Sequence, residues 1–159
     1  MAKIRIISVG DFKEKYLKDA FFEYKKRLSA YAEIEEVVLS EEKIRNEDSE
    51  SEIRSALKTE GEKIIVSLPR DSFRIALCVE GRELDSPSLA NEISRALDST
   101  GKICFIIGSS HGLSNEVKQD AHLKLSFSKM TFPHQLMKVI LAEAVYRSFT
   151  IIAGKKYHK

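Results

Sequence analysis

The chain has 159 residues, 43% of them hydrophobic, which is enough for one domain with a sizeable core. It contains no run of about 18 consecutive apolar residues, so the sequence predicts no membrane span, and the early charges of the N-terminus argue against a signal peptide. We therefore expect residues 1–159 to form a single domain in the cytoplasm.

Charge is distributed unevenly along the chain. The formal net charge is only +2, but residues 101–159 contain nine lysines and arginines against three acidic residues, a charge of +6. Residues 1–100 therefore carry −4, and all four histidines lie in the C-terminal part. This asymmetry predicts a basic face for an anionic partner, most often nucleic acid. An accidental arrangement of helix surfaces would give the same count.

Apolar periodicity predicts alternating strands and helices in the first half of the chain. Residues 3–9 and 33–39 are rich in β-branched side chains and predict strands. Between them, apolar and aromatic residues at helical spacing predict a helix within 12–31. Residues 40–52 are polar and acidic, which is typical of a solvated loop. A helix follows, with four apolar residues on one face: Ile53, Leu57, Ile64 and Leu68.

The alternation continues in the second half. Three further strands are predicted: residues 73–81, 102–108 and 123–128. Ser86 and Pro87 mark the start of a helix, and a last helix begins at Pro133 and runs to about Ala153. Strands that alternate with helices predict an α/β fold, with a mainly parallel sheet covered by helices on both faces.

Ligand sites in such sheets form in the loops that follow the carboxyl ends of strands. This rule selects three segments: residues 77–81, 108–112 and 126–133. In the second segment, Gly108 and Gly112 allow a ligand to approach the backbone closely, although an ordinary strand-to-helix turn capped by Ser114 explains the same residues. Their spacing fits neither a dinucleotide fingerprint nor a P-loop.

The third segment combines aromatic and polar residues. Phe127 and Phe132 flank the polar and apolar residues 128–131, just before the last helix. A short connection with free backbone groups beside aromatic surface is suited to a heteroaromatic ring. The alternative is a hydrophobic staple around the start of a helix.

The last helix is apolar on nearly every side, through ten residues: Leu136, Met137, Val139, Ile140, Leu141, Val145, Tyr146, Phe149, Ile151 and Ile152. A helix of this kind is buried in the core or against another subunit, so we expect a homodimer. Glu143 and Arg147 are four positions apart on it. They form either an ordinary ion pair or an arginine held by its glutamate for RNA phosphate.

The two cysteines, Cys78 and Cys104, each lie inside an apolar run. We expect both to be buried thiols in a reducing compartment. Two isolated cysteines do not predict a zinc site, and the sequence suggests no metal.

Three segments together resemble the RlmH family: "FIIGSSHGLSNEV", "LSFSKMTFPHQLMKVILAEAVYR" and the terminal "GKKYHK". RlmH enzymes are small SPOUT-class methyltransferases of bacterial large-subunit ribosomal RNA. The resemblance covers nearly the whole chain. It implies a C-terminal trefoil knot, a homodimer, S-adenosylmethionine as methyl donor, and methylation of a pseudouridine at ring N3 in 23S rRNA of the assembled ribosome. A knot could not be predicted from periodicity, because chains are rarely knotted.

The resemblance also implies the residues of the site. The cofactor pocket falls on residues in the three segments selected above: Leu77, Gly108, Phe127, Ser128, Lys129, Met130, Thr131 and Phe132. Arg147, Tyr157 and His158 are the catalytic candidates. In a dimer, the tail of one subunit would close the cofactor site of the other.

The chemistry requires alignment of the methyl group with the acceptor nitrogen, and removal of a proton from that nitrogen. Histidine titrates near neutral pH, so His158 is a candidate base, and solvent is the alternative. A donor or cation near the carbonyls of the base, such as Tyr157 or Arg147, would favour the anion. The sequence does not choose among these roles.

Two other functions remain open at this point. One is a flavodoxin-like domain that binds a flavin phosphate at the turn after Gly108, and it gives the C-terminal tail no role. The other is a non-catalytic protein that binds RNA or the ribosome without taking up S-adenosylmethionine.

Overall fold

The computed structural model describes residues 1–159, and its centre is a sheet of five strands. The strands are β1 (Ala2–Val9), β2 (Ala32–Leu39), β3 (Phe73–Glu83), β4 (Lys102–Ile107) and β5 (Leu123–Ser126). Their order across the sheet is β2-β1-β4-β3-β5, and every pairing is parallel. The five predicted strands and the parallel sheet are therefore confirmed.

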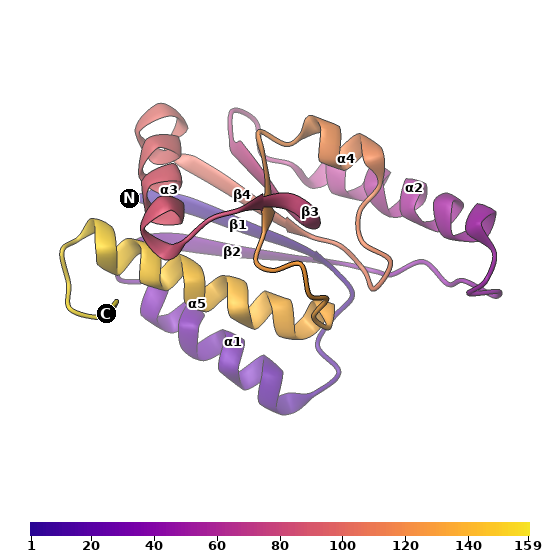
Figure 1. Cartoon of the computed structure of the whole chain (residues 1–159), viewed down its shortest axis with the longest axis horizontal. Coiled ribbons are helices and arrows are strands. Elements are labelled where there is room, and N and C mark those ends of the chain that lie inside the picture. Colours follow the sequence, from indigo (N-terminus) through magenta and orange to yellow (C-terminus); the bar gives the residue numbers. More distant parts are fainter.

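Helices cover both faces of this sheet (Figure 1). They are α1 (Lys15–Leu28), α2 (Glu50–Ser67), α3 (Ser86–Thr100), α4 (Asn115–Asp120) and α5 (His134–Ile152). Helices α1, α3 and α5 share one buried apolar cluster with the sheet, and α2 and α4 share the other. The predicted α/β architecture is confirmed, while the trefoil knot stays a prediction. No helix has the length and hydropathy needed to cross a membrane.

The starts of three helices are set by side-chain caps. The hydroxyl of Ser49 accepts a hydrogen bond from the backbone of Glu52, so α2 begins earlier than the polar composition of residues 40–52 predicts. Asp85 caps α3, one position before the predicted start. Ser114 caps α4, as predicted.

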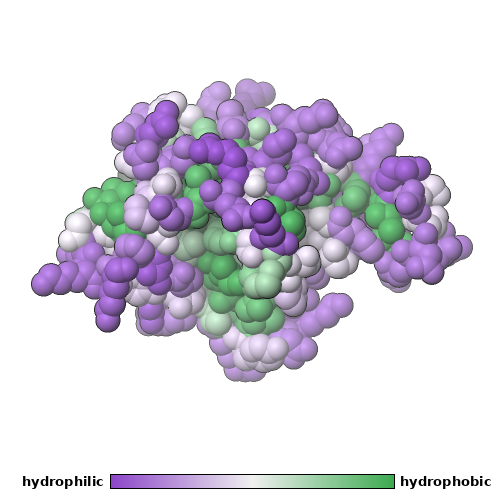
Figure 2. All heavy atoms as spheres, viewed as in Figure 1, coloured by the Kyte–Doolittle hydropathy of each residue, from purple (hydrophilic) through white to green (hydrophobic).

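The outer side of α5 is apolar and incompletely covered. Figure 2 shows hydrophobic side chains gathered over α5. Ile152 is 44% exposed. The other apolar residues of this surface are only partly buried: Leu136, Met137, Ile140, Ala144 and Ile151. An apolar helix face of this kind is typical of a surface that packs against a partner.

The inner side of α5 carries a buried charge. Lys138 is 3% exposed, forms an ion pair with Glu36 of β2, and donates a hydrogen bond to the hydroxyl of Ser8, 2.9 Å away. Its ammonium group also lies 4.8 Å and 4.9 Å from the ring centres of Phe12 and Phe21. Burial lowers the pKa of Lys138 and Glu36 opposes that effect. The first turns of α5 are therefore tied to β1, β2 and α1.

Replacing Lys138 by alanine tests this anchor. We expect Lys138→Ala to lower the free energy of unfolding by about 3 kcal/mol, because it leaves the Glu36 carboxylate, which is only 17% exposed, without its partner. The double variant Lys138→Met/Glu36→Leu should recover most of the loss, since it removes both charges. Urea denaturation measures both. A loss below about 1 kcal/mol, as for an exposed ion pair, would contradict the anchor.

Candidate active site

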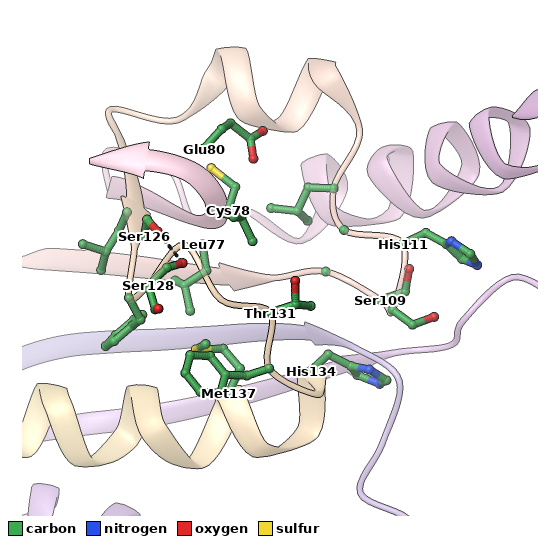
Figure 3. Close-up of a pocket in the computed structure, with 18 of the residues that line it drawn as sticks. Leu77, Cys78, Glu80, Ser109, His111, Ser126, Ser128, Thr131, His134 and Met137 are labelled. Carbon is green, nitrogen blue, oxygen red and sulfur yellow. Dashed lines mark hydrogen bonds between the residues drawn. The ribbon is translucent and has the colours of Figure 1, made fainter. Parts of the chain in front are cut away.

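A cavity of about 700 Å³ opens at the carboxyl ends of β3, β4 and β5. Its walls come from the three segments selected by the strand-end rule and from the start of α5. Figure 3 shows Cys78 and Glu80 on one side of the cavity and His134 and Met137 on the opposite side, with Thr131 between them. A cavity therefore lies at the place where the sequence predicts a ligand site.

Most of the predicted cofactor-binding residues line this cavity. They are Leu77, Gly108, Phe127, Ser128, Met130, Thr131 and Phe132. Lys129 is exposed and does not belong to the lining. The structure thus brings together residues that are up to 55 positions apart in the sequence, while their role as cofactor ligands stays a prediction.

Gly108 lies in a turn so tight that no residue with a side chain can take its place. A Cβ atom added at Gly108 would lie 2.2 Å from the backbone oxygen of Gly112. The backbone nitrogen of Gly112 donates to the oxygen of Ser109 at 2.9 Å, and the φ of Gly112 is 87°. Both glycines are required by this turn, which presents backbone to the cavity.

The loop after β5 is held by two serines. Ser126 donates from its hydroxyl to the backbone oxygen of Ser128, and the Ser128 hydroxyl accepts a hydrogen bond from the backbone of Met130, each at 3.0 Å. These bonds hold the loop open beside the cavity, with Phe127 and Phe132 both in its lining. The segment therefore offers aromatic surface and backbone groups together, as the heteroaromatic-ring interpretation requires.

A charged pair on the cavity wall was not predicted from the sequence. Lys118 of α4 donates to the carboxylate of Glu80 at 2.5 Å and holds the pKa of Glu80 below its ordinary value. Across the cavity, burial lowers the pKa of His134. The site thus combines an apolar floor with one carboxylate, one ammonium group and a histidine that burial keeps neutral.

Cys78 corrects one prediction. Cys104 is fully buried, and burial raises the pKa of its thiol to about 12. Cys78 is only half-buried, because it lies where β3 passes the covered part of the sheet and turns toward the cavity. The prediction of a buried thiol is therefore right for Cys104 and wrong for Cys78.

The acidic loop between β2 and α2 is tied to the cavity rim rather than fully solvated. A ring nitrogen of His111 lies 2.7 Å from the carboxylate of Glu47, and the hydroxyl of Ser110 donates to Glu41 at 3.4 Å. Below this contact, the carboxylate of Glu60 accepts a hydrogen bond from the backbone of Glu42 at 2.9 Å. The loop therefore supports the turn after Gly108 from outside.

The catalytic candidates come together at the other end of α5. Arg147 donates twice to one carboxylate oxygen of Glu143, at 2.9 Å and 2.6 Å. The hydroxyl of Tyr157 donates to the same oxygen at 3.2 Å, and the guanidinium of Arg147 lies 3.3 Å from Nδ1 of His158. Glu143 is thus the centre of a cluster that contains all three predicted residues.

The contacts of this cluster define the protonation of two side chains. Burial and the nearby Glu143 raise the pKa of Tyr157, so its hydroxyl stays protonated at neutral pH. A guanidinium group has donors and no acceptor, so Nδ1 of His158 accepts from Arg147. Neutral His158 in this arrangement carries its proton on Nε2, where it is a hydrogen-bond donor.

The pocket and the cluster are separate in one chain. No residue of the tail lines the cavity, which lies at the start of α5. Glu143 follows His134 by nine positions, or about 14 Å along a helix. Figure 1 shows the C-terminus beside the far end of α5. A chain therefore does not close its own cavity with its own tail.

Fold and site define a class of methyltransferase. A model of the SPOUT family, described as "Predicted SPOUT methyltransferase", matches residues 2–158, and the chain belongs to this family. Family membership decides against the flavodoxin-like alternative. A solved structure of a probable methylase family protein from Haemophilus influenzae has the same fold, with a TM-score of 0.56 and 15% identity, over 98% of this chain and 70% of that one.

Closer relatives are named for one member of that family. The protein of Shouchella clausii named "Ribosomal RNA large subunit methyltransferase H" is 51% identical over 158 residues, 98% of this chain and 99% of its own length. The protein of the same name from Bacillus pumilus is 48% identical, with the same coverage. These relatives confirm the resemblance to the RlmH family.

The buried carboxylate of Glu60, which accepts a hydrogen bond from the loop between β2 and α2, provides a testable prediction. It is 3% exposed, its Oε1 has no partner, and burial raises its pKa. A raised pKa in the folded state means that its contribution to stability is present below the unfolded pKa and is lost as the pH rises through the folded value. We expect Glu60→Gln to gain stability relative to the parent over that range.

Urea denaturation at a series of pH values measures this difference. The free energy of unfolding of the parent should fall relative to that of Glu60→Gln as the pH rises above the ordinary pKa of glutamate. Two profiles that run parallel through this range would show that Glu60 ionises in the folded chain as easily as in the unfolded one.

Proposed function

We propose that this chain is an S-adenosylmethionine-dependent methyltransferase that acts on a pseudouridine, at ring N3, in the 23S rRNA of the assembled ribosome in the cytoplasm. The observation that carries the proposal is the pairing of a cavity of about 700 Å³ with a separate Glu143–Arg147–Tyr157–His158 cluster. The names of the relatives support the RNA substrate.

The lining of the cavity fits the proposed cofactor. Leu77 and Phe127 provide apolar surface for a purine ring, and the turn after Gly108 provides backbone groups at a point that no Cβ can enter. Glu80 and Lys118 add opposite charges for the polar part of the molecule. When bound, S-adenosylmethionine supplies an electrophilic methyl group on a sulfonium sulfur. The residues that would hold and orient it are those of the lining: Leu77, Phe127, Ser128, Met130, Thr131 and Phe132.

The cluster fits the acceptor. A ring imide nitrogen becomes nucleophilic when its proton leaves, and the negative charge then spreads to the neighbouring carbonyl oxygens. Arg147 and Nε2–H of His158 have donors left to stabilise such charge, whereas the hydroxyl proton of Tyr157 is donated to Glu143, which places Tyr157 as a support for Glu143 and Arg147. In this assignment solvent takes the proton, because the free nitrogen of His158 is occupied by Arg147.

A homodimer brings the two parts together. The apolar outer face of α5 leads directly from the cavity to the tail, and it is incompletely covered in one chain. A second copy on this face would bury it and would place the tail of one subunit near the cavity of the other. Four exposed lysines would then surround the composite site and attract RNA phosphate: Lys129, Lys155, Lys156 and Lys159.

Removal of the tail tests the proposal. We expect the chain without residues 157–159 to fold and to bind S-adenosylmethionine with parental affinity, since no tail residue lines the cavity. It should transfer no methyl group to ribosomes that lack the modification. Calorimetry measures the first property, and mass spectrometry of 23S rRNA measures the second. If the full chain does not bind S-adenosylmethionine, the non-catalytic alternative is favoured. Full turnover by the chain without residues 157–159 would refute the role of the tail.

The pH dependence of methyl transfer tests the role of His158. A base at this position would make the rate fall as the pH falls through the titration of histidine. A donor role predicts no additional step at the titration of histidine, and leaves only the smooth dependence of the rate on ionisation of the imide nitrogen. We expect the rate to rise with pH toward the pKa of the imide, with the same profile in His158→Gln at a lower rate. A histidine-dependent step that Gln abolishes would identify His158 as the base.

A further inference from the structure

A continuous series of contacts between aromatic rings and guanidinium groups joins α1, α5 and the tail. The guanidinium carbon of Arg27 lies 5.3 Å from the ring centre of Tyr24 and 5.8 Å from that of Tyr146. The rings of Tyr146 and Tyr157 meet edge to face, with centres 4.9 Å apart. The guanidinium carbon of Arg147 lies 4.8 Å from the ring centre of Tyr157. We call these five residues the tyrosine–arginine stack.

Tyr146 is the middle of this stack. It contacts Arg27 of α1 and Tyr157 of the tail, and its ring centre lies 6.3 Å from that of Tyr31, in the turn between α1 and β2. Arg27 is in turn paired with Glu23 at 3.3 Å on the same helix. The position of Tyr146 is therefore set by α1 as well as by α5.

The tail has few other attachments. Residues 153–156 are exposed, and the backbone of Lys155 donates to Thr150 at 2.8 Å before the chain continues to Tyr157. Beyond that point the tail is held by the ring of Tyr157, by its bond to Glu143 and by the contact of His158 with Arg147. Short terminal segments are disordered unless they are tied down. The contact between the rings of Tyr146 and Tyr157 is therefore a principal restraint on the orientation of the tail.

We propose that Tyr146 and Arg27 are positioning residues for methyl transfer, which hold Tyr157 and His158 in the orientation that the acceptor base requires. This inference rests on the proposed function. Positioning of a reacting group accounts for a large part of enzymatic rate, so a tail that is attached but mobile would bind RNA and transfer methyl groups slowly. Neither residue lines the cavity, so neither contributes to cofactor binding.

The test measures kcat of methyl transfer in the parent and in four variants: Tyr146→Ala, Tyr146→Phe, Arg27→Ala and Arg27→Lys. We expect kcat to fall about tenfold in both alanine variants, because each loses a ring or cation contact of the stack. Tyr146→Phe keeps the ring and should keep most of the rate, and Arg27→Lys keeps the cation and should recover part of it. The dissociation constant of S-adenosylhomocysteine should not change in any variant. Tyr16→Ala, an exposed tyrosine on α1, is the matched control and should match the parent.

A second measurement separates positioning from general stability. Hydrogen exchange of residues 155–159 should be faster in Tyr146→Ala and Arg27→Ala than in the parent, with the sheet unchanged. Arg27 is exposed, so Arg27→Ala should stay folded and can be measured even if Tyr146→Ala unfolds. Parental kcat with an unchanged tail in Arg27→Ala would overturn the inference. Absence of methyl transfer by the parent would overturn the proposed function instead, and the exchange data would still decide whether the stack holds the tail.

Discussion

The fixed position of α5 is the constraint on which the rest of the structure depends. The helix forms one wall of the cavity at its start and carries Glu143 and Arg147 near its end. Its first turns are held by the buried ammonium group of Lys138, which contacts β1, β2 and two aromatic rings at once. Because a helix is a rigid element, fixing its first turns also fixes the distance between cavity and cluster.

A rigid separation of this kind explains why the site is built in two parts. The cavity has apolar surface, backbone groups and one pair of opposite charges, which suit recognition of a cofactor. In the cluster, the carboxylate of Glu143 accepts hydrogen bonds from Arg147 and Tyr157, and Arg147 in turn contacts His158. The negative charge of Glu143 thus holds Arg147 and Tyr157 in place. In the function proposed above, a second copy of the chain brings both parts to one RNA base.

The order of the elements could be predicted because it depends on local patterns. Local composition and apolar patterning predicted all five strands, and the meeting of parallel carboxyl ends at one edge predicted the cavity. Contacts between distant positions could not be predicted in this way. Glu80 and Lys118 are 38 positions apart, and Glu47 and His111 are 64 apart, and nothing in the local sequence of either pair indicates its partner.

The same limit applies to the cluster. The spacing of Glu143 and Arg147 predicted their ion pair, but the proton on His158 follows only from the side of the ring that Arg147 contacts. Cys78 was assigned to the core because its neighbours in sequence are apolar, whereas the strand turns out of the covered sheet at that point. Burial in such a strand depends on what covers it.

Complementation in mixed dimers tests the composite site most directly. One subunit carries Gly108→Leu, which fills the turn of the cavity, and the other lacks residues 157–159. Dimers of each variant alone should be inactive. If the tail of one subunit serves the cavity of the other, mixed dimers hold one intact site and should methylate 23S rRNA at about half the parental rate. Inactive mixed dimers, with both chains folded and paired, would contradict the account.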